Sequence, residues 1–207
     1  MTRIANPHVI TVTLAHPGCL AASIRRFPGD RDVWIFIMAE LLMFGVFFVA
    51  YIVHRRAEVT LFNASQAALD RTLGVLNTLI LVTSSWAVVS AVEAARAKRT
   101  AAVVRHLGVA IALALAFVAV KYVEYSAKFE AGINLTTNSF YMFYFSLTMV
   151  HLFHVVGGTV ILIVVRQNAK GGAYHPASME GLEAGASYWH MVDLLWIFLF
   201  ALLYLLR

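Results

Sequence analysis

The chain has 207 residues, of which 61 % are hydrophobic and 13 % are charged, and its mean hydropathy is +0.77. Soluble domains carry about 25 % charged residues, so this composition excludes an ordinary soluble enzyme or binding module. The formal net charge of +5 does not indicate a nucleic-acid-binding protein, because the basic residues lie in short runs between apolar stretches.

The first 30 residues are polar, and we expect them to form an N-terminal tail ahead of a single domain of residues 31–207. The tail lacks the continuous apolar core of a cleaved signal peptide, since His8 and Pro17 interrupt it. It contains the single cysteine of the sequence, Cys19, so an internal disulfide and a CxxCH haem attachment motif are both excluded. Membrane insertion is therefore expected to start with the first apolar helix.

Five apolar segments follow, each long enough to cross the hydrocarbon core of a bilayer, which takes about 20 residues of helix. They are residues 33–53, 73–93, 107–128, 139–165 and 187–206. Their connections are short, so consecutive helices are expected to be antiparallel neighbours in one bundle. The sequence thus predicts an all-α integral membrane protein with five transmembrane helices.

The distribution of Lys and Arg predicts the orientation of these helices. The tail and the second and fourth connections carry ten of the sixteen basic residues, and the opposite side carries five. Cytoplasmic segments are enriched in Lys and Arg. The N-terminus is therefore predicted to be cytoplasmic.

Glu40 lies about two turns into the first apolar segment. Desolvation favours the neutral form of a carboxyl group at this depth, unless His190 or another polar group reaches it. Such a group either takes part in proton movement, where a hydrophobic carbodiimide could also react with it, or is a protonated glutamate hydrogen-bonded to a neighbouring helix. Both interpretations are open.

Polar residues also mark the second and third segments. Asn77, Ser84 and Ser85 fall on one stripe of a helix, because seven or eight residues separate the first from the others. Lys121 and Glu124 are three residues apart and are expected to neutralise each other on one helix face. We interpret them as a structural ion pair.

Two further pairs with the same spacing lie in the last two segments. His190 and Asp193 are expected to hydrogen-bond to each other. His151 and His154 resemble a zinc or haem site, but no third ligand is linked to them by a motif. The sequence therefore predicts a polar, proton-related interior of histidine and carboxyl groups, with no catalytic residue and no metal site in this chain.

Four segments that carry these residues resemble subunit III of the haem–copper oxidase superfamily. The segments are WIFIMAELLMFGVFFVAY (34–51), LNTLILVTSSW (76–86), EYSAKFEAGINLTTNSFYMFYFSLTMVHLFHVVGGTVIL (124–162) and YWHMVDLLWIFLFALLY (188–204). They occur in the order and on the helices expected for that family. Longer members have seven helices, and five correspond to the short bacterial form.

The resemblance implies a non-catalytic accessory subunit in a bacterial inner membrane. Its partners would be a haem–copper catalytic subunit, other respiratory-complex subunits and membrane lipids. It would bind no haem or metal itself, whereas the catalytic subunit would carry haem with copper or iron, and a bound phospholipid is expected. The implied roles are stability of the complex, lipid binding and proton uptake.

Within the family, the segment EYSAKFEAGINLTTNSFYMFYF looks closest to the E-type accessory protein of nitric oxide reductase, the NorE-like branch. Many oxidase members also read Thr-Gly-Phe-His-Gly-Leu-His over this stretch, so both histidines remain here but the glycines before them do not. The sequence therefore leaves the partner as either a nitric oxide reductase or an oxygen reductase.

Two rival functions remain. A haem-binding membrane cytochrome would use His151, His154 or His190 as axial ligands. A stand-alone proton or ion transporter would be built on Glu40 and Lys121, and inverted repeats or broken helices are typical of that class. The sequence shows neither feature.

Overall fold

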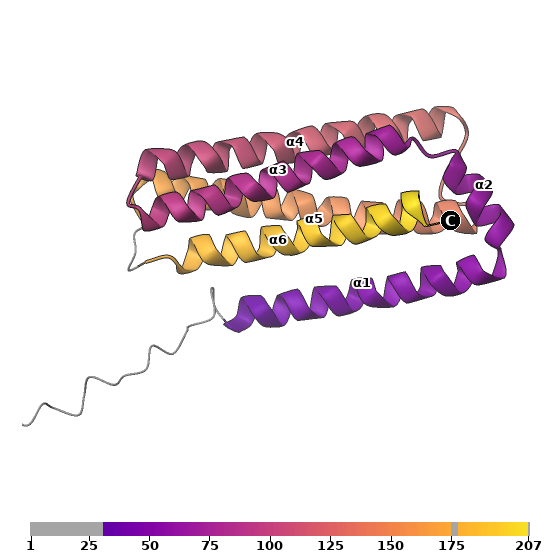
Figure 1. The fold of residues 1–207 in the computed structure, drawn as a ribbon, viewed down its shortest axis with the longest axis horizontal. Helices are drawn as coiled ribbons and strands as arrows, with labels where there is room; N and C mark the ends of the chain where they lie inside the picture. The colour runs from indigo at the N-terminus through magenta and orange to yellow at the C-terminus, as the bar shows by residue number, and fades with distance from the viewer. Residues whose placement is uncertain (1–30, 175–177, 207) are drawn as a thin grey trace, which may run out of the picture.

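The computed structural model describes residues 31–174 and 178–206, so the predicted tail of residues 1–30 lies outside the described residues. Five long helices dominate the structure (Figure 1). They are α1 (Arg31–Ala57), α3 (Arg71–Arg96), α4 (Thr100–Glu130), α5 (Ser139–Lys170) and α6 (Glu180–Phe200), which continues into a π-helical turn, η1 (Ala201–Leu205). Each is long and apolar enough to cross a membrane. The predicted all-α bundle of five transmembrane helices is confirmed.

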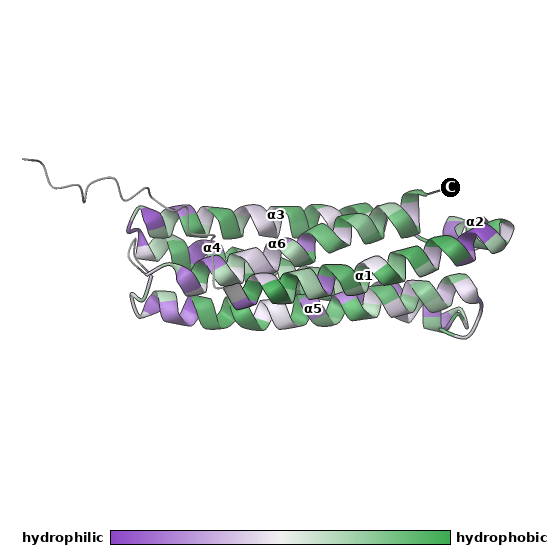
Figure 2. Cartoon of the chain, turned by 90° about the horizontal axis from the view of Figure 1, so that it is seen from below, coloured by the Kyte–Doolittle hydropathy of each residue, from purple (hydrophilic) through white to green (hydrophobic). Residues whose placement is uncertain are grey.

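The helices extend beyond the predicted apolar segments at one or both ends, because polar residues form their first and last turns (Figure 2). Asp70 caps α3 by accepting hydrogen bonds from the backbone N–H groups of Thr72 and Leu73, at 2.8 and 3.3 Å. Asn138 caps α5 by accepting one from the N–H of Tyr141 at 2.9 Å. These caps satisfy backbone donors that the helix leaves unpaired at its start.

A short helix, α2 (Val59–Ala67), was not predicted. It lies across the end of the bundle opposite to the start of α1 (Figure 1). Its Phe62 is fully buried, and the centroid of the Phe62 ring lies 5.3 Å from that of Tyr51 and 5.7 Å from that of Phe140. Nine residues cannot span a bilayer. We interpret α2 as a connection that carries the chain from α1 to α3.

The packing order differs in one respect from the expected one. Helices α3, α4, α5 and α6 do pack against their neighbours in sequence, and α3 also packs against α6. Helix α1, however, makes its main helix contacts with α6 and α5 rather than with α3. The expectation that the first two long helices are neighbours was wrong, because α2 displaces the chain across the bundle end before α3 begins.

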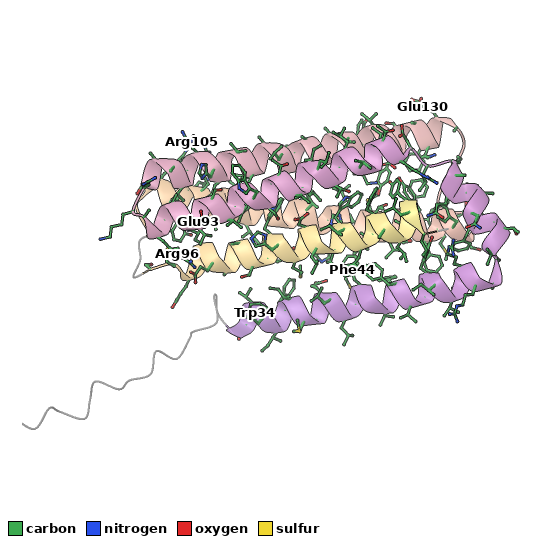
Figure 3. The ribbon with its side chains drawn as sticks, in the orientation of Figure 1. Trp34, Phe44, Glu93, Arg96, Arg105 and Glu130 are labelled. Atoms are coloured by element: carbon green, nitrogen blue, oxygen red, sulfur yellow. The ribbon has the colours of Figure 1, made fainter. Side chains whose placement is uncertain are left out.

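Helix α1 lies at the edge of the bundle and buries one narrow stripe. Ile37, Phe44 and Tyr51 are seven residues apart and at most 5 % exposed. Figure 3 shows Phe44 on the side of α1 that faces the other helices. Most of the remaining surface of α1 is apolar and exposed, as expected for a helix that meets lipid or another membrane protein. The cytoplasmic placement of the N-terminus stays a prediction that rests on the Lys and Arg distribution.

Candidate functional site

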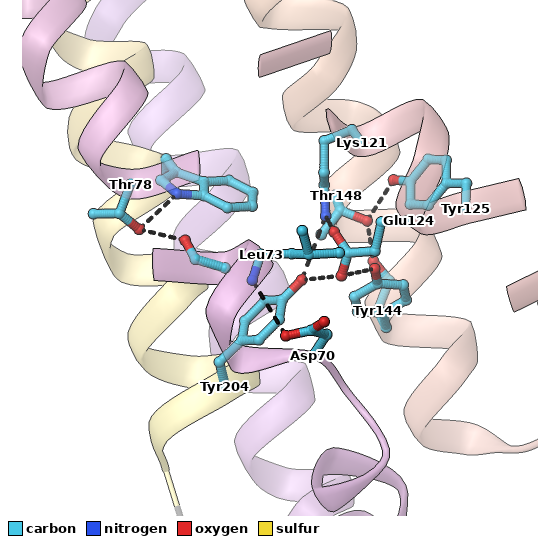
Figure 4. Close-up of polar contacts among 11 residues, drawn as sticks. Asp70, Leu73, Thr78, Lys121, Glu124, Tyr125, Tyr144, Thr148 and Tyr204 are labelled. Atoms are coloured by element: carbon cyan, nitrogen blue, oxygen red, sulfur yellow. Dashed lines mark hydrogen bonds and ion pairs between the residues drawn. The ribbon is translucent and has the colours of Figure 1, made fainter. Parts of the chain in front are cut away.

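Lys121, Glu124, Tyr144 and Tyr204 form a buried polar cluster, which we call the Lys121 network (Figure 4). It joins α4, α5 and η1. Lys121 Nζ lies 2.8 Å from Glu124 Oε2, and the two side chains are 0 % and 2 % exposed. The hydroxyl groups of Tyr144 and Tyr204 donate to Glu124 Oε1 at 2.8 and 2.6 Å. The structure thus brings together the two residues predicted as an ion pair.

The hydrogen bonds of the Lys121 network favour an ionised pair. Glu124 accepts from three donors, and a carboxylate accepts without donating. The rings of Tyr125, Tyr144 and Trp196 lie 5.1 to 5.3 Å from Lys121 Nζ, within the range of cation–π attraction. These contacts offset part of the cost of removing both charges from water.

Glu40 meets His154 across the α1–α5 contact. His154 Nε2 lies 3.0 Å from Glu40 Oε2, and His154 Nδ1 lies 2.8 Å from the carbonyl oxygen of Val150. The carbonyl can only accept, so Nδ1 carries a hydrogen. One further proton is then shared between Nε2 and Oε2, either as an acid beside a neutral imidazole or as a carboxylate beside an imidazolium. The polar group that reaches Glu40 is His154 and not His190.

An apolar groove of about 520 Å³ opens next to this pair, between α1 and the α5–α6 contact. It is lined by Phe36 of α1, Gly157 and Ile161 of α5, and Gly185 and Tyr188 of α6. Phe36 stacks on Tyr188 at 6.0 Å, and the Tyr188 hydroxyl donates to the His154 carbonyl at 3.3 Å. The groove therefore ends one helical turn from Glu40.

His190 and Asp193 are not joined in the predicted way. His190 Nδ1 lies 3.1 Å from the hydroxyl oxygen of Ser85, on α3, and no direct hydrogen bond to Asp193 occurs within the described residues. The side chain that His190 contacts therefore comes from the neighbouring helix and not from its own.

The predicted stripe of α3 faces the bundle, but its members have different partners. Asn77, Ser84 and Ser85 are all buried. Ser84 donates to the backbone carbonyl of Ala110 on α4 at 3.1 Å. Neither the oxygen nor the nitrogen of the Asn77 side-chain amide has a hydrogen-bond partner in the described part of the chain. Ser84 and Ser85 therefore make separate contacts to α4 and α6, and Asn77 makes no side-chain hydrogen bond within the described residues.

The two histidines of α5 point to different helices. His151 is fully buried, and its Nε2 donates to the carbonyl of Val192 on α6 at 3.0 Å, whereas His154 reaches Glu40 on α1. No group of three His, Cys, Asp or Glu residues that could hold a metal occurs among the residues that the structure describes. The pair therefore links α5 to two neighbours.

Sequence reasoning missed the hydroxyl groups that complete the polar interior. Tyr144 and Tyr204 bind Glu124, and the Tyr125 hydroxyl lies 2.6 Å from that of Thr148, which in turn donates to the Tyr144 carbonyl. One signal was present. Tyr144 and Thr148 are four residues apart, so they share a face of α5.

Comparison with known proteins shows which family the sequence of this chain resembles. The protein-family model of cytochrome c oxidase subunit III matches residues 30–207. Cytochrome c oxidase subunit 3 of Synechocystis sp. is 33 % identical over 175 residues, which cover 84 % of this chain and 74 % of the relative. The protein of the same name from Marchantia polymorpha is 34 % identical over 176 residues, 82 % of this chain and 65 % of the relative. A probable cytochrome c oxidase subunit 3 of Rickettsia conorii is 29 % identical over 187 residues, which cover 83 % of this chain and 65 % of the relative.

Proposed function

The chain belongs to the cytochrome c oxidase subunit III family, and on this basis we propose that it is a non-catalytic accessory subunit of a haem–copper respiratory complex in a bacterial inner membrane. The observation that carries the proposal is the family match over residues 30–207. The geometry supports it, since the intramembrane His151 and His154 are engaged in separate contacts between helices. The haem with copper or iron would then reside in the partner.

Removal of the chain from the complex tests this role. We expect the complex without it to retain its haem and initial turnover but to lose activity faster during turnover, because an accessory subunit supports the metal-bearing subunit rather than the chemistry. The measurement is activity against the number of turnovers, with and without the chain. Equal rates of inactivation would contradict the proposed role.

Two partners are compatible with this role. The names of the relatives support an oxygen-reducing catalytic subunit. The segment of residues 124–145 supports a nitric oxide reductase, because it resembles the accessory branch of that enzyme. Oxygen and nitric oxide consumption by the co-purified complex distinguishes them.

We assign the Glu40–His154 pair to proton exchange with the complex. Glu40→Gln keeps a side chain that can donate to His154 Nε2, so α1 should stay in place, but it removes the proton that the two groups share. We expect normal assembly together with altered proton uptake or a changed inactivation rate. Glu40→Leu is the matched variant that also removes the hydrogen bond, and it should weaken the contact of α1. Unchanged kinetics in Glu40→Gln would reject a role in proton exchange.

The apolar groove beside this pair is the proposed phospholipid site. Apart from the exposed Asp32 and the Tyr188 hydroxyl, which donates to the His154 carbonyl, its lining is apolar or small, so it can accept an acyl chain. Gly157→Phe places a ring in the groove, since a Cβ at Gly157 would meet only the Tyr188 hydroxyl, at 3.6 Å. We expect this variant to lose tightly bound phospholipid, measured by mass spectrometry after detergent washing.

The control is Gly45→Phe, because a Cβ at Gly45 meets nothing within 4 Å. Gly45 is also absent from the lining of the groove. Equal lipid content in the two variants would show that the groove is not the lipid site.

A further inference from the structure

The outer face of α3 differs from the outer faces of α1 and α5. Within the expected spans of α1 and α5, residues 33–53 and 139–165, every exposed residue is apolar or glycine. Lipid chains can cover those two faces without leaving a polar side chain unpaired. The exposed face of α3 also carries polar groups, and we call it the Trp86 face. Its exposed residues in the middle of the span are Leu79, Val82, Thr83, Trp86 and Val89.

Trp86 presents a hydrogen-bond donor to the outside of the bundle. Its side chain is 67 % exposed, and its indole N–H makes no hydrogen bond within the described residues. Trp86 lies about 10 Å along the helix from Glu93, where the apolar span ends. Long side chains on a helix point back toward its N-terminus, so the indole points away from that end and deeper into the span. Lipid chains offer no acceptor there, whereas a neighbouring protein does.

Two hydroxyl groups lie about one turn from Trp86 on either side. Thr83 Oγ1 donates to the Leu79 carbonyl at 2.7 Å, and Ser90 Oγ donates to the Trp86 carbonyl at 3.0 Å. Each hydroxyl hydrogen is therefore paired within α3, and each oxygen can still accept a hydrogen bond from another chain. Serine and threonine are common where membrane helices pack against one another. The Trp86 face thus has the composition of a contact between helices.

A pocket of about 230 Å³ lies at one end of this face, between α3 and α6. Its apolar walls include Val89 and Val92, and Glu93, Arg96 and Glu183 line its charged part. Figure 3 shows Glu93 and Arg96 near the end of α3, beside the start of α6. Arg96 pairs with Glu183 at 3.1 Å, but Glu93 forms no ion pair in the described part of the chain. The pocket can therefore hold the apolar stem of a Lys or Arg side chain, with the charge beside Glu93.

We propose that the Trp86 face and this pocket bind a transmembrane helix of the metal-bearing subunit. The partner helix presents a hydrogen-bond acceptor to the Trp86 indole and a basic side chain to Glu93, at the border of the membrane. Membrane borders are enriched in Lys and Arg on the cytoplasmic side, so a basic residue is common at such a position. This inference rests on the proposed accessory role and names the surface through which the chain performs it.

A second copy of this chain fits the Trp86 face poorly. Two copies related by a two-fold axis along the membrane normal meet at the same depth, so each residue on the axis faces itself. Trp86 would then face Trp86, and two indole donors cannot pair. Glu93 would likewise face Glu93, and two carboxylates repel each other. The arrangement of donors and charge therefore favours a different chain.

Photo-crosslinking in the native membrane tests the surface directly. A benzophenone amino acid replaces Leu79 on the Trp86 face or, as the control, Phe153 on the exposed face of α5, and both positions are well exposed. After irradiation, the full chain is purified and its adducts are identified by mass spectrometry. We expect an adduct of the Leu79 variant with the metal-bearing subunit and only lipid adducts of the Phe153 variant. An adduct of the Leu79 variant with lipid alone, with a second copy or with any other protein would overturn the proposal.

Charge and hydrogen-bond variants measure the strength of the contact. Trp86→Phe keeps a ring and removes the N–H, so we expect the chain to dissociate from the complex about threefold more readily on detergent dilution, as for one hydrogen bond between membrane helices. Glu93→Lys sets like charges against each other and should weaken retention at least about tenfold. Glu130→Lys is the matched control, because Glu130 is exposed at the opposite end of the bundle.

The outcomes separate this surface from the accessory role. Equal retention of Glu93→Lys and Glu130→Lys in a complex that still contains the metal-bearing subunit would overturn the proposed surface and leave the accessory role standing. Failure of the unmodified chain to co-purify with any metal-bearing subunit would overturn the accessory role itself. Trp86 and Glu93 are both exposed, so the unfolding temperature of each variant should equal that of the unmodified chain.

Discussion

Lys121→Met is expected to destabilise the bundle by about 3–5 kcal/mol, the usual cost of removing one partner of a buried ion pair. Glu124 would keep its place between Tyr144 and Tyr204 but would lose the cation that balances its charge. Methionine fills a similar volume and adds no polar group. The measurement is thermal or denaturant unfolding of the purified chain in detergent, followed by circular dichroism.

The double variant Lys121→Met with Glu124→Gln separates charge from packing. A neutral amide can still accept from the two tyrosines, so most of the lost stability should return. Arg105→Met, at an exposed position, should change stability by less than about 0.5 kcal/mol. Wild-type stability in Lys121→Met, or a double variant as unstable as the single one, would show that the pair is not ionised as the geometry indicates.

Gly158→Ala is expected to cost about 1–3 kcal/mol, the range for overpacking a filled core. A Cβ at this position would lie 2.9 Å from Trp189 Cε3 and 3.0 Å from Tyr188 Cε1, so α5 and α6 would have to separate. Trp189 is only 1 % exposed and has little room to move. The loss should appear as a lower unfolding temperature.

Gly157, the residue before Gly158, provides a control for this prediction. Gly157→Ala places a Cβ no closer than 3.6 Å to another group, the Tyr188 hydroxyl, and should be close to neutral. Both substitutions change helix propensity equally, so the difference between them reports the α5–α6 contact alone. If the two alanine variants unfold at the same temperature, α5 and α6 do not pack closely at Gly158.

Hydropathy predicted the five long helices because a bilayer imposes a strict minimum length on an apolar helix. It could not predict α2, whose nine residues mix polar and apolar side chains. Nor could it place α1 against α5 and α6, since that contact depends on where α2 leads the chain. The helix ends extended further than expected because caps such as Asp70 lie in the polar interface.

Helical spacing predicted which polar residues share a face, but it did not predict what enters from other helices. Lys121 and Glu124 do meet within α4. His190 and Asp193 have the same spacing, yet Ser85 of α3 reaches His190 instead. Glu40 needed a partner, and periodicity along one helix does not identify one on another, so His154 became evident only in the structure.

We propose that this chain supports a metal-bearing partner without holding a metal or haem itself. The direct test is to isolate the tagged chain from its own membrane in mild detergent, separate the subunits that accompany it, and measure haem, iron and copper in each. We expect a haem–copper catalytic subunit at fixed stoichiometry, with all of the haem and metal in that subunit. Stoichiometric haem or metal on this chain, or its isolation without any metal-bearing partner, would contradict this accessory role.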